Sequence, residues 1–279
     1  MRLFLLTALV MVAFAGNSVL NRAALIAGEI DPLQFAWIRA GSGALALAIM
    51  VLVRDRRLSV IGPHRIAGVG SLALYMIAFS VAYVSLDAGA GALILFGVVQ
   101  VTMFAGAVLV REPIPVLRWV GAGLAFGGLV WLLWPGEAEQ GSLLHGGLMV
   151  AAGIGWGIYS LVGRKSREPL RATAANFILV APICFAVLAV MPVAPDAVAA
   201  SSKGIWLAVV SGVVTSAMGY ALWYTVLLKL ASSVAAVAQL TVPVIALAGG
   251  ILFLGEAVTV QFVIASVLVL GGVALSLRR

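Results

Sequence analysis

The sequence predicts an all-α membrane protein with ten transmembrane helices, arranged as two inverted five-helix repeats around a central cavity. Two observations concern composition: 63% of the 279 residues are hydrophobic and only 10% are charged, and the mean hydropathy is +1.18. Such a chain is too apolar for a water-soluble domain. The third observation is that motifs in the first half recur in the same order in the second half.

The apolar stretches are separated by short connections containing Pro, Gly or charged residues. They cover residues 3–21, 32–53, 65–86, 89–110, 114–134, 143–163, 171–191, 203–228, 232–254 and 258–277. A membrane-spanning helix needs roughly 20 mostly apolar residues. Each stretch therefore predicts one span, and the connections leave no room for a soluble catalytic domain.

The distribution of Lys and Arg predicts the orientation, because these residues are retained on the cytoplasmic side. With the N-terminus inside, basic clusters at 54–57 and 164–171 fall in inner connections, and the chain ends inside with Arg278 and Arg279. The outer connections keep only Arg22 and Lys203. They carry the acidic residues Glu29, Asp31, Glu137, Glu139 and Asp196. We expect a multi-pass protein of the bacterial inner (plasma) membrane with both termini in the cytoplasm.

The net charge of +7 does not indicate a nucleic-acid partner, because the basic residues lie in short clusters between apolar stretches. The expected partners are the lipid bilayer and a small-molecule substrate. The fifth and tenth stretches are almost entirely Leu, Val, Ala and Gly, which is typical of a packing or dimer surface. A monomer and a homodimer both remain open.

Four features of the first half recur in chain order in the second half and indicate an internal repeat. They are an Arg at the end of a span, an acidic residue followed by Pro, a Glu, and a Gly-Gly pair. Asn21-Arg22 corresponds to Gly163-Arg164, and Asp31-Pro32 corresponds to Glu168-Pro169, which places Arg39 opposite Asn176. Glu112 and Glu256 each precede a Gly-Gly pair at the same spacing. We predict repeats over 1–134, with spans one to five, and 142–279, with spans six to ten. An odd number of spans per repeat inverts the second repeat, which is typical of secondary transporters that work by alternating access.

Polar side chains inside the spans are the candidate substrate-binding residues, because a polar group in hydrocarbon needs a partner or a wet cavity. Arg39 stands out, since an uncompensated charge there costs at least ~2.5 kcal/mol. It either attracts a substrate carboxylate or ties backbone carbonyls together. The candidate set comprises Asn17, Arg39, Tyr75, Tyr83, Gln100, Thr102, Tyr159, Tyr220, Tyr224, Gln239 and Thr241.

The tyrosines of this set predict an amphipathic wall, whose ring faces pack on apolar groups and attract ammonium groups. Tyr220 and Tyr224 lie four residues apart, on one helical face. The alternative is an interfacial belt or plain packing. Gln100 and Gln239 each precede a Thr by two residues, and these pairs fit either a zwitterionic substrate or hydrogen bonds between helices.

Hinge candidates are Gly89, Gly91, Gly97 and Pro243. The glycines cluster around the third-to-fourth connection, where bending during a transport cycle and close helix packing are both consistent with them. Pro243 removes a backbone hydrogen bond in the middle of the predicted ninth span, which predicts a hinge or a static kink.

These residues also carry a family resemblance over essentially the whole chain. Asn17 running into Asn21-Arg22, Arg39, the segment 156–159, the segment 241–244 before Gly255-Glu256, and the terminal Gly-Gly helices resemble the drug/metabolite transporter superfamily, in its EamA-like ten-helix branch. Within it the chain is most similar to YddG-type amino acid exporters. The resemblance implies export of aromatic and other neutral amino acids from the cytoplasm. One departure is Val99, which stands in the first repeat where Pro243 stands in the second.

No motif indicates an enzyme, a metal site or a cofactor. The single Cys184 lies in an apolar run, His64 and His145 fall at predicted span ends, and no nucleophile is paired with a base. Asp87, Glu112 and Glu256 also lie at span ends, so the sequence predicts a proton-independent facilitator. Alternatives are an exporter of lipophilic cations, drugs or other metabolites, and, from another class, a channel or a structural membrane subunit.

Overall fold

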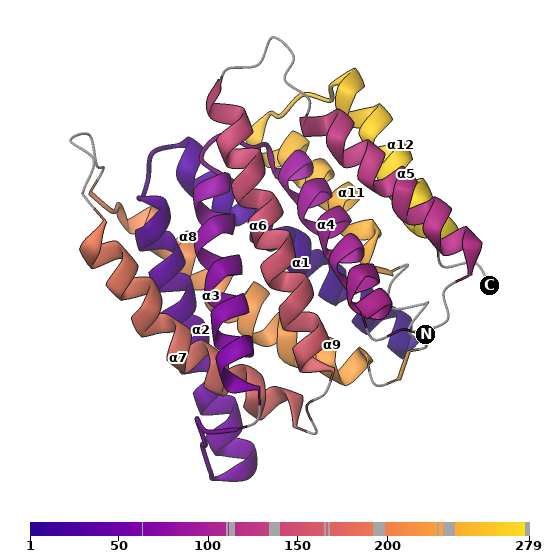
Figure 1. The fold of residues 1–279 in the computed structure, drawn as a ribbon. Helices are drawn as coiled ribbons and strands as arrows, with labels where there is room; N and C mark the ends of the chain where they lie inside the picture. The colour runs from indigo at the N-terminus through magenta and orange to yellow at the C-terminus, as the bar shows by residue number, and fades with distance from the viewer. Residues whose placement is uncertain are drawn as a thin grey trace.

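The computed structural model describes residues 1–62, 64–109, 111, 115–133, 140–164, 166, 168–191, 199–227, 229–230 and 238–276. In this part of the chain every regular element is helical (Figure 1). The first half contains α1 (Arg2–Ile26), α2 (Pro32–Asp55), α3 (Arg65–Ala82), α4 (Ala88–Leu109) and α5 (Val116–Leu133). The second contains α6 (Gln140–Gly163), α7 (Pro169–Val190), α8 (Ser202–Val210), η1 (Ser211–Met218), α9 (Gly219–Leu227), α11 (Thr241–Gly249), η2 (Gly250–Leu254) and α12 (Val260–Ser276).

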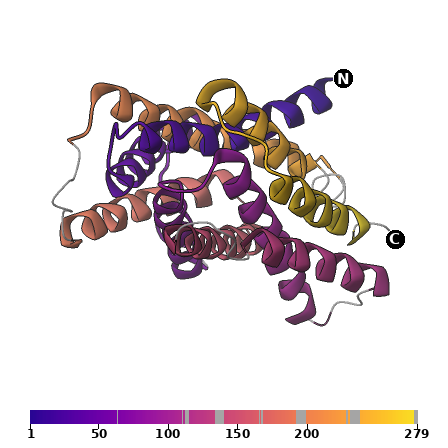
Figure 2. The ribbon, with the colours of Figure 1, turned by 90° about the horizontal axis from the view of Figure 1, so that it is seen from above.

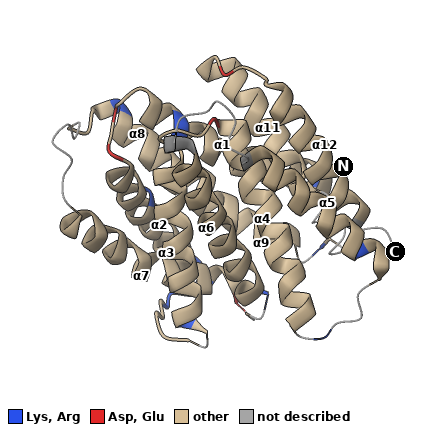
Figure 3. Cartoon of the chain, turned by 45° about the horizontal axis from the view of Figure 1, so that its top comes forward, with Lys and Arg blue, Asp and Glu red and all other residues tan. Residues whose placement is uncertain are grey.

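The chain is a multi-pass membrane protein. Seven helical segments of the described residues are long and apolar enough to cross a bilayer, and shorter apolar helices cover Val116–Leu132, Thr241–Leu254 and Val260–Leu275. Large apolar side chains such as Phe4 and Val267 are exposed on the outside of the bundle, where lipid would cover them. Lys, Arg, Asp and Glu residues lie mainly at helix ends and connections (Figure 3). The inverted ten-span arrangement and the membrane side of each terminus remain predictions.

Local signals in the sequence account for where individual helices begin and end. The Asp31 side chain accepts hydrogen bonds from the backbone N–H groups of Leu33 and Gln34, at 2.8 and 3.3 Å, and Pro32 occupies the first turn of α2. This combination is a strong helix start. Ser201 caps α8 in the same way, accepting from the N–H of Gly204 at 3.0 Å.

We call the two ends of the bundle the lower and the upper end, as they appear in Figure 1. The lower end in Figure 1 contains the end of α2 at Asp55, the start of α3 at Arg65 and the connection between α6 and α7. The upper end contains the connections between α1 and α2 and between α3 and α4, together with the start of α8.

Helices α5 and α12 lie side by side at one edge of the bundle (Figures 1 and 2). Glycines make this pairing close. A Cβ atom at Gly272 would lie 2.6 Å from the backbone oxygen of Gly121, and one at Gly128 would lie 2.8 Å from the Cβ of Leu268. Small residues at a helix interface allow such contact between backbones in a membrane.

The span from Ser202 to Leu227 is one continuous helix whose middle part, η1, has the wider π-helical turn. π-helical turns are rare and concentrate at functional sites. Gly212 of η1 packs directly on α2, since a Cβ atom there would overlap the carbonyl oxygen of Arg39 and the hydroxyl of Ser42. The second half of the chain therefore contacts the first at the level of Arg39.

Pro243 lies just after an interruption of the helix, since residues 238 and 239 are helical and a turn at Leu240 precedes α11. Helix α11 begins at Thr241 after a turn at Leu240, so Pro243 lies in the first turn, where its missing N–H leaves no helical bond broken. The predicted glycine hinges all lie at close contacts: Cβ atoms at Gly89, Gly91 and Gly97 would lie 2.9 Å or less from Leu247, Tyr83 and Leu129, respectively. Hinge motion at these positions stays a prediction.

Candidate functional site

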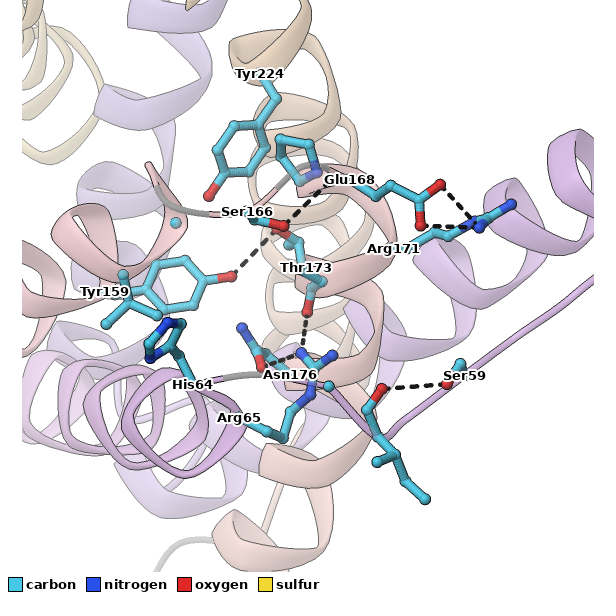
Figure 4. A pocket seen from close by; sticks show the side chains of 16 residues that line it. Ser59, His64, Arg65, Tyr159, Ser166, Glu168, Arg171, Thr173, Asn176 and Tyr224 are labelled. Carbon is cyan, nitrogen blue, oxygen red and sulfur yellow. Dashed lines mark hydrogen bonds and ion pairs between the residues drawn. The ribbon is translucent and has the colours of Figure 1, made fainter.

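A cavity of about 380 Å³ opens at the lower end of the bundle, which we call the first cavity. It is formed by the start of α3, the end of α6, the start of α7 and Tyr224 of α9 (Figure 4). Its polar lining residues are Ser59, His64, Arg65, Tyr159, Ser166, Glu168, Arg171, Thr173, Asn176 and Tyr224.

Arg65 and Asn176 face each other in this cavity (Figure 4). The Nη1 of Arg65 donates to the Oδ1 of Asn176 at 2.6 Å and to the backbone oxygen of Ala172 at 2.8 Å. Its Nε is buried without a hydrogen-bond partner among the described residues. The guanidinium is thus held in place by neutral acceptors and keeps unused donor capacity.

The other arginine of the first cavity is already neutralised. The Nε of Arg171 lies 2.7 Å from the Oδ2 of Asp55, and its Nη1 lies 2.9 Å from the carboxylate of Glu168. Asp55 also pairs with Arg54 at 2.9 Å. These pairs join the end of α2 to the start of α7 at the rim.

A second cavity of about 340 Å³ adjoins the first, and the two share five lining residues, including Tyr159 and Tyr224. Most of the wall of the second cavity is aromatic or apolar. Its described lining side chains are Gln100, Met103, Trp156, Tyr159, Ser160, Ser166, Pro169, Tyr220, Trp223, Tyr224, Leu227, Leu230 and Gln239, with the exposed Arg164 as the one charged residue among them. Such a wall suits a ligand with a large apolar portion and a few polar groups.

A buried polar centre lies where α1, α2 and η1 meet. Its members Asn17, Arg39, Ser211, Thr215 and Ser216 are each at most 7% exposed. The Oδ1 of Asn17 accepts hydrogen bonds from the hydroxyls of Ser211, Thr215 and Ser216. This centre joins the two halves of the chain by side-chain hydrogen bonds inside the bundle.

Arg39 is completely buried in this centre. Its Nε donates to the Oγ of Ser216 at 3.0 Å, and its Nη2 donates to the hydroxyl of Tyr75 at 2.9 Å. Its Cζ lies 5.2 Å from the ring centroid of Tyr75 and 5.0 Å from that of Phe79, within cation–π range. Its Nη1 has no hydrogen-bond partner within the described chain.

Trp156 and Tyr220 separate the polar centre from the second cavity. Their ring centroids are 4.9 Å apart, and both residues line the second cavity as well as a void of about 10 Å³ that also touches Asn17 and Tyr75. The void has room for about one water molecule. The Tyr220 hydroxyl is buried without a described hydrogen-bond partner, so the partition contains an unused polar group.

The upper end is held together by polar contacts between distant parts of the chain. The Nη1 of Arg22 donates to the backbone oxygens of Tyr83 and Val84, at 3.1 and 2.8 Å. Its Nε lies 3.8 Å from Glu256. Burial raises the pKa of Glu256, an effect opposed mainly by its hydrogen bond from the N–H of Ala88. We call this group, Arg22, Asp87, Ala88 and Glu256, the upper seal.

A second upper contact links the connection between α1 and α2 to α8. The Ser201 hydroxyl and the Lys203 ammonium both donate to the carboxylate of Glu29. The hydrogen bond from Ser201, followed by that from Lys203, holds the pKa of Glu29 below its usual value. The two larger cavities described here thus lie at the lower end, whereas polar contacts join distant segments at the upper end.

The predicted site residues divide into three groups. Asn17, Arg39, Tyr75 and Tyr220 meet at or beside the polar centre, and Gln100, Tyr159, Tyr220, Tyr224 and Gln239 line the second cavity. Thr102, Tyr83 and Thr241 line neither cavity.

Each residue of that third group has a structural contact. Thr102 packs on Gly157, whose Cβ atom would lie 2.7 Å from that of the threonine. The Tyr83 hydroxyl donates to the backbone oxygen of Ala88 at 3.4 Å, and the exposed Thr241 donates to that of Ala238 at 2.7 Å. A substrate-binding role for these three stays a prediction.

Sequence reasoning missed Arg65 as a cavity residue. An arginine at the start of a predicted span, close to the basic cluster at 54–57, is equally typical of a cytoplasmic connection. The available clue was Asn176, which the repeat places opposite Arg39 and which contacts Arg65 in the structure. Trp156 was noted only as part of a family motif, although it forms the partition. Glu112, the repeat counterpart of Glu256, lies outside the described residues.

Comparison with known proteins gives the family. The chain is 42% identical over 279 residues to the uncharacterized protein PA1977 of Pseudomonas aeruginosa, a match that covers 99% of this chain and 94% of that protein. It is 24% identical to an uncharacterized transporter of Archaeoglobus fulgidus, covering 90% of each chain, and 20% identical to the uncharacterized transporter YoaV of Bacillus subtilis, covering 88% and 87%.

A solved crystal structure shares the fold, with a TM-score of 0.65, 17% sequence identity and 96% of each chain covered. The EamA-like transporter family matches the sequence twice, over residues 1–134 and 146–278. These two matched segments together cover nearly all of the described helices. The chain therefore belongs to the EamA-like transporter family, within the drug/metabolite transporter superfamily.

Proposed function

We propose that this protein exports small metabolites, in particular aromatic and other neutral amino acids, across the bacterial inner membrane by alternating access. The observation that carries the proposal is the asymmetry of the bundle: an aromatic cavity adjoins a polar one at the lower end, while polar contacts tie distant segments together at the upper end. Access from one side at a time is what a carrier requires.

The lower end corresponds to the cytoplasmic side in this proposal. It contains the basic cluster at 54–57 as well as Arg65, Arg164 and Arg171, and an excess of Lys and Arg is typical of cytoplasmic connections. The present structure then corresponds to a state open to the cytoplasm. Residues 1–134 and 142–279 are proposed as inverted repeats whose relative movement would open the other side.

The lining favours amino acids over larger or more highly charged molecules. A cavity of about 340 Å³ is near the lower limit of small-molecule sites, and the rings of Trp156, Tyr220 and Trp223 suit an apolar or aromatic side chain. Arg65 and the neighbouring hydroxyls suit the polar end of the molecule. A substrate with several phosphate charges would need more arginines than the first cavity offers.

Coupling to protons is not part of the proposal. The polar centre, as far as the structure describes it, holds neutral groups and Arg39 rather than a carboxylate or a histidine. Glu256 lies at the upper end, outside the helices. We therefore propose a facilitator driven by the substrate gradient.

The test is counterflow in proteoliposomes that contain the purified protein. Liposomes preloaded with unlabelled phenylalanine or leucine should accumulate the labelled amino acid transiently, with saturation and without a pH gradient. Empty liposomes and protein with Trp156→Ala serve as controls. Accumulation of a lipophilic cation alone would favour the drug-export alternative, flux that rises linearly without counterflow would indicate a channel, and flux that requires a pH gradient would contradict the facilitator.

A further inference from the structure

Arg65 of the first cavity and Arg39 of the polar centre have no carboxylate partner among the described residues. Neither Arg65 nor Arg39 lies within ion-pair distance of a described Asp or Glu. Arg22 and Arg171, by contrast, each contact two carboxylates. Arg22 and Arg171 are therefore neutralised by neighbouring carboxylates, whereas Arg65 and Arg39 are held by neutral groups.

Each of these two arginines also retains an unused donor. The Nε of Arg65 and the Nη1 of Arg39 are buried without a hydrogen-bond partner in the described chain. A buried N–H of a charged group that makes no bond is costly. Neutral acceptors already hold both guanidinium groups in position, so an incoming anion would meet donors that need no reorganisation.

The positions of the two arginines determine the order in which an entering molecule would contact them. Arg65 lines the first cavity, which is open at the lower end, whereas Arg39 lies in the polar centre behind the Trp156–Tyr220 partition. The second cavity connects these levels, since it shares Tyr159 and Tyr224 with the first cavity and borders the partition. A molecule moving inward would meet Arg65 first and Arg39 after the partition opens.

Among the described residues that line the two cavities, no carboxylate is free to bind a substrate cation. Glu168, the carboxylate that lines the first cavity, is paired with Arg171. An ammonium group would therefore contact only ring faces and hydroxyls there.

We infer that the transported molecule is recognised by its carboxylate, which Arg65 binds in the open cavity and Arg39 binds at the polar centre. The amino group of the transported molecule is dispensable. This inference rests on the proposed function and names the substrate class of the same site.

The experiment compares four phenyl compounds: phenylalanine, phenylalaninamide, phenethylamine and 3-phenylpropionate. Direct transport of each is measured in proteoliposomes, and binding is measured separately as a shift in melting temperature of the purified protein. We expect the two carboxylates to be transported and to stabilise the protein. The amide and the amine should be weaker by about ten- to a hundredfold, the factor expected for one charged hydrogen bond.

Variants of the two arginines test whether these residues cause the preference for carboxylates over the amide. In Arg65→Gln the ratio of carboxylate to amide binding should fall toward one, and Arg65→Lys should recover part of it. In Arg39→Gln carboxylate binding should persist while the maximum transport rate falls. Because each ratio is taken within one preparation, the amount of folded protein cancels. The matched control is Arg57→Gln, an exposed arginine near the same end that lines neither cavity; it should keep the ratio of the unmodified protein.

The outcomes separate the inference from the proposed function. Equal transport of acid, amide and amine would overturn the inference and leave an amino acid exporter standing. Stabilisation that depends on the carboxylate and on Arg65, without any flux, would support the inference and contradict the transport proposal. Absence of both flux and stabilisation with every compound would overturn both.

Discussion

Glu256 accepts the backbone N–H of Ala88 with both carboxylate oxygens, at 2.8 and 3.0 Å. The contact joins the connection before α12 to the first residue of α4, where the helix N-terminus favours a negative charge. Arg22 of α1 lies 3.8 Å from the same carboxylate. Three distant segments therefore meet at one buried side chain of the upper seal.

Replacing that carboxylate should loosen the upper seal. Glu256→Gln removes the negative charge from a group that pairs with Arg22 and accepts a backbone N–H, and the loss of one charged hydrogen bond costs about 1.5–3 kcal/mol. A reporter cysteine at Ser80, which is buried and bonded to Asn21, should then react faster with a thiol reagent, in a Cys184→Ala background. Glu168→Gln, at the other end, is the matched control. Equal labelling in all three proteins would show that Glu256 does not keep the upper end closed.

Acidification should weaken the contact between Glu29 and the start of α8. The pKa of Glu29 lies below its ordinary value of 4.5 because Ser201 and Lys203 donate to the carboxylate. A lowered folded pKa means that this contribution to stability is complete above the unfolded pKa and is lost as the pH falls through the folded one. The melting temperatures of the unmodified protein and of Glu29→Gln should differ at neutral pH and approach each other as the pH falls below 4.5. A gap of constant size across this range would contradict the assignment.

Gly212 should not tolerate replacement by a residue with a side chain. A Cβ atom there would overlap the Arg39 carbonyl oxygen and the Ser42 hydroxyl, so Gly212→Ala would push η1 away from α2. Overpacking of this kind costs about 1–3 kcal/mol. Gly41→Ala, on α2 beside the same contact, has open space around its Cβ atom and should be neutral or slightly stabilising, as alanine is in helices. Thermal unfolding in detergent measures both, and equal melting temperatures would exclude the close contact.

The lower cavities should be accessible to reagents from one side of the membrane. Cys184 is 1% exposed, so the unmodified protein should give little background. A cysteine at Ser166, which lines both cavities, should react with a membrane-impermeant maleimide in inside-out vesicles and stay unlabelled in right-side-out ones. A cysteine at Ser211, in the polar centre, should be protected in both. Labelling of Ser166→Cys only in right-side-out vesicles would reverse the proposed orientation.

The sequence by itself determined the class of protein and the location of most helices. Apolar stretches long enough to cross a bilayer, interrupted by Pro, Gly and charge, correspond to the helices because hydrocarbon forces each spanning backbone to satisfy its own hydrogen bonds. The start of α2 at Pro32 follows from the Asp31 cap. Asn17, Arg39 and Tyr220 could also be predicted as site residues from the sequence. They are polar residues inside predicted spans, where a polar group must find a partner.

Only the tertiary structure decided which of those polar residues meet. Asn17 and Ser216 are 199 positions apart in the chain, and their hydrogen bond depends on how α1 packs on η1, which no local pattern encodes. The same holds for Arg65, whose charge at a helix start is equally consistent with an exposed cytoplasmic position. Its role in the cavity arises from α7, which places Asn176 and the carbonyl of Ala172 around the guanidinium. Local composition determines that a segment enters the membrane, whereas packing of distant helices determines which of its polar atoms remain without a partner.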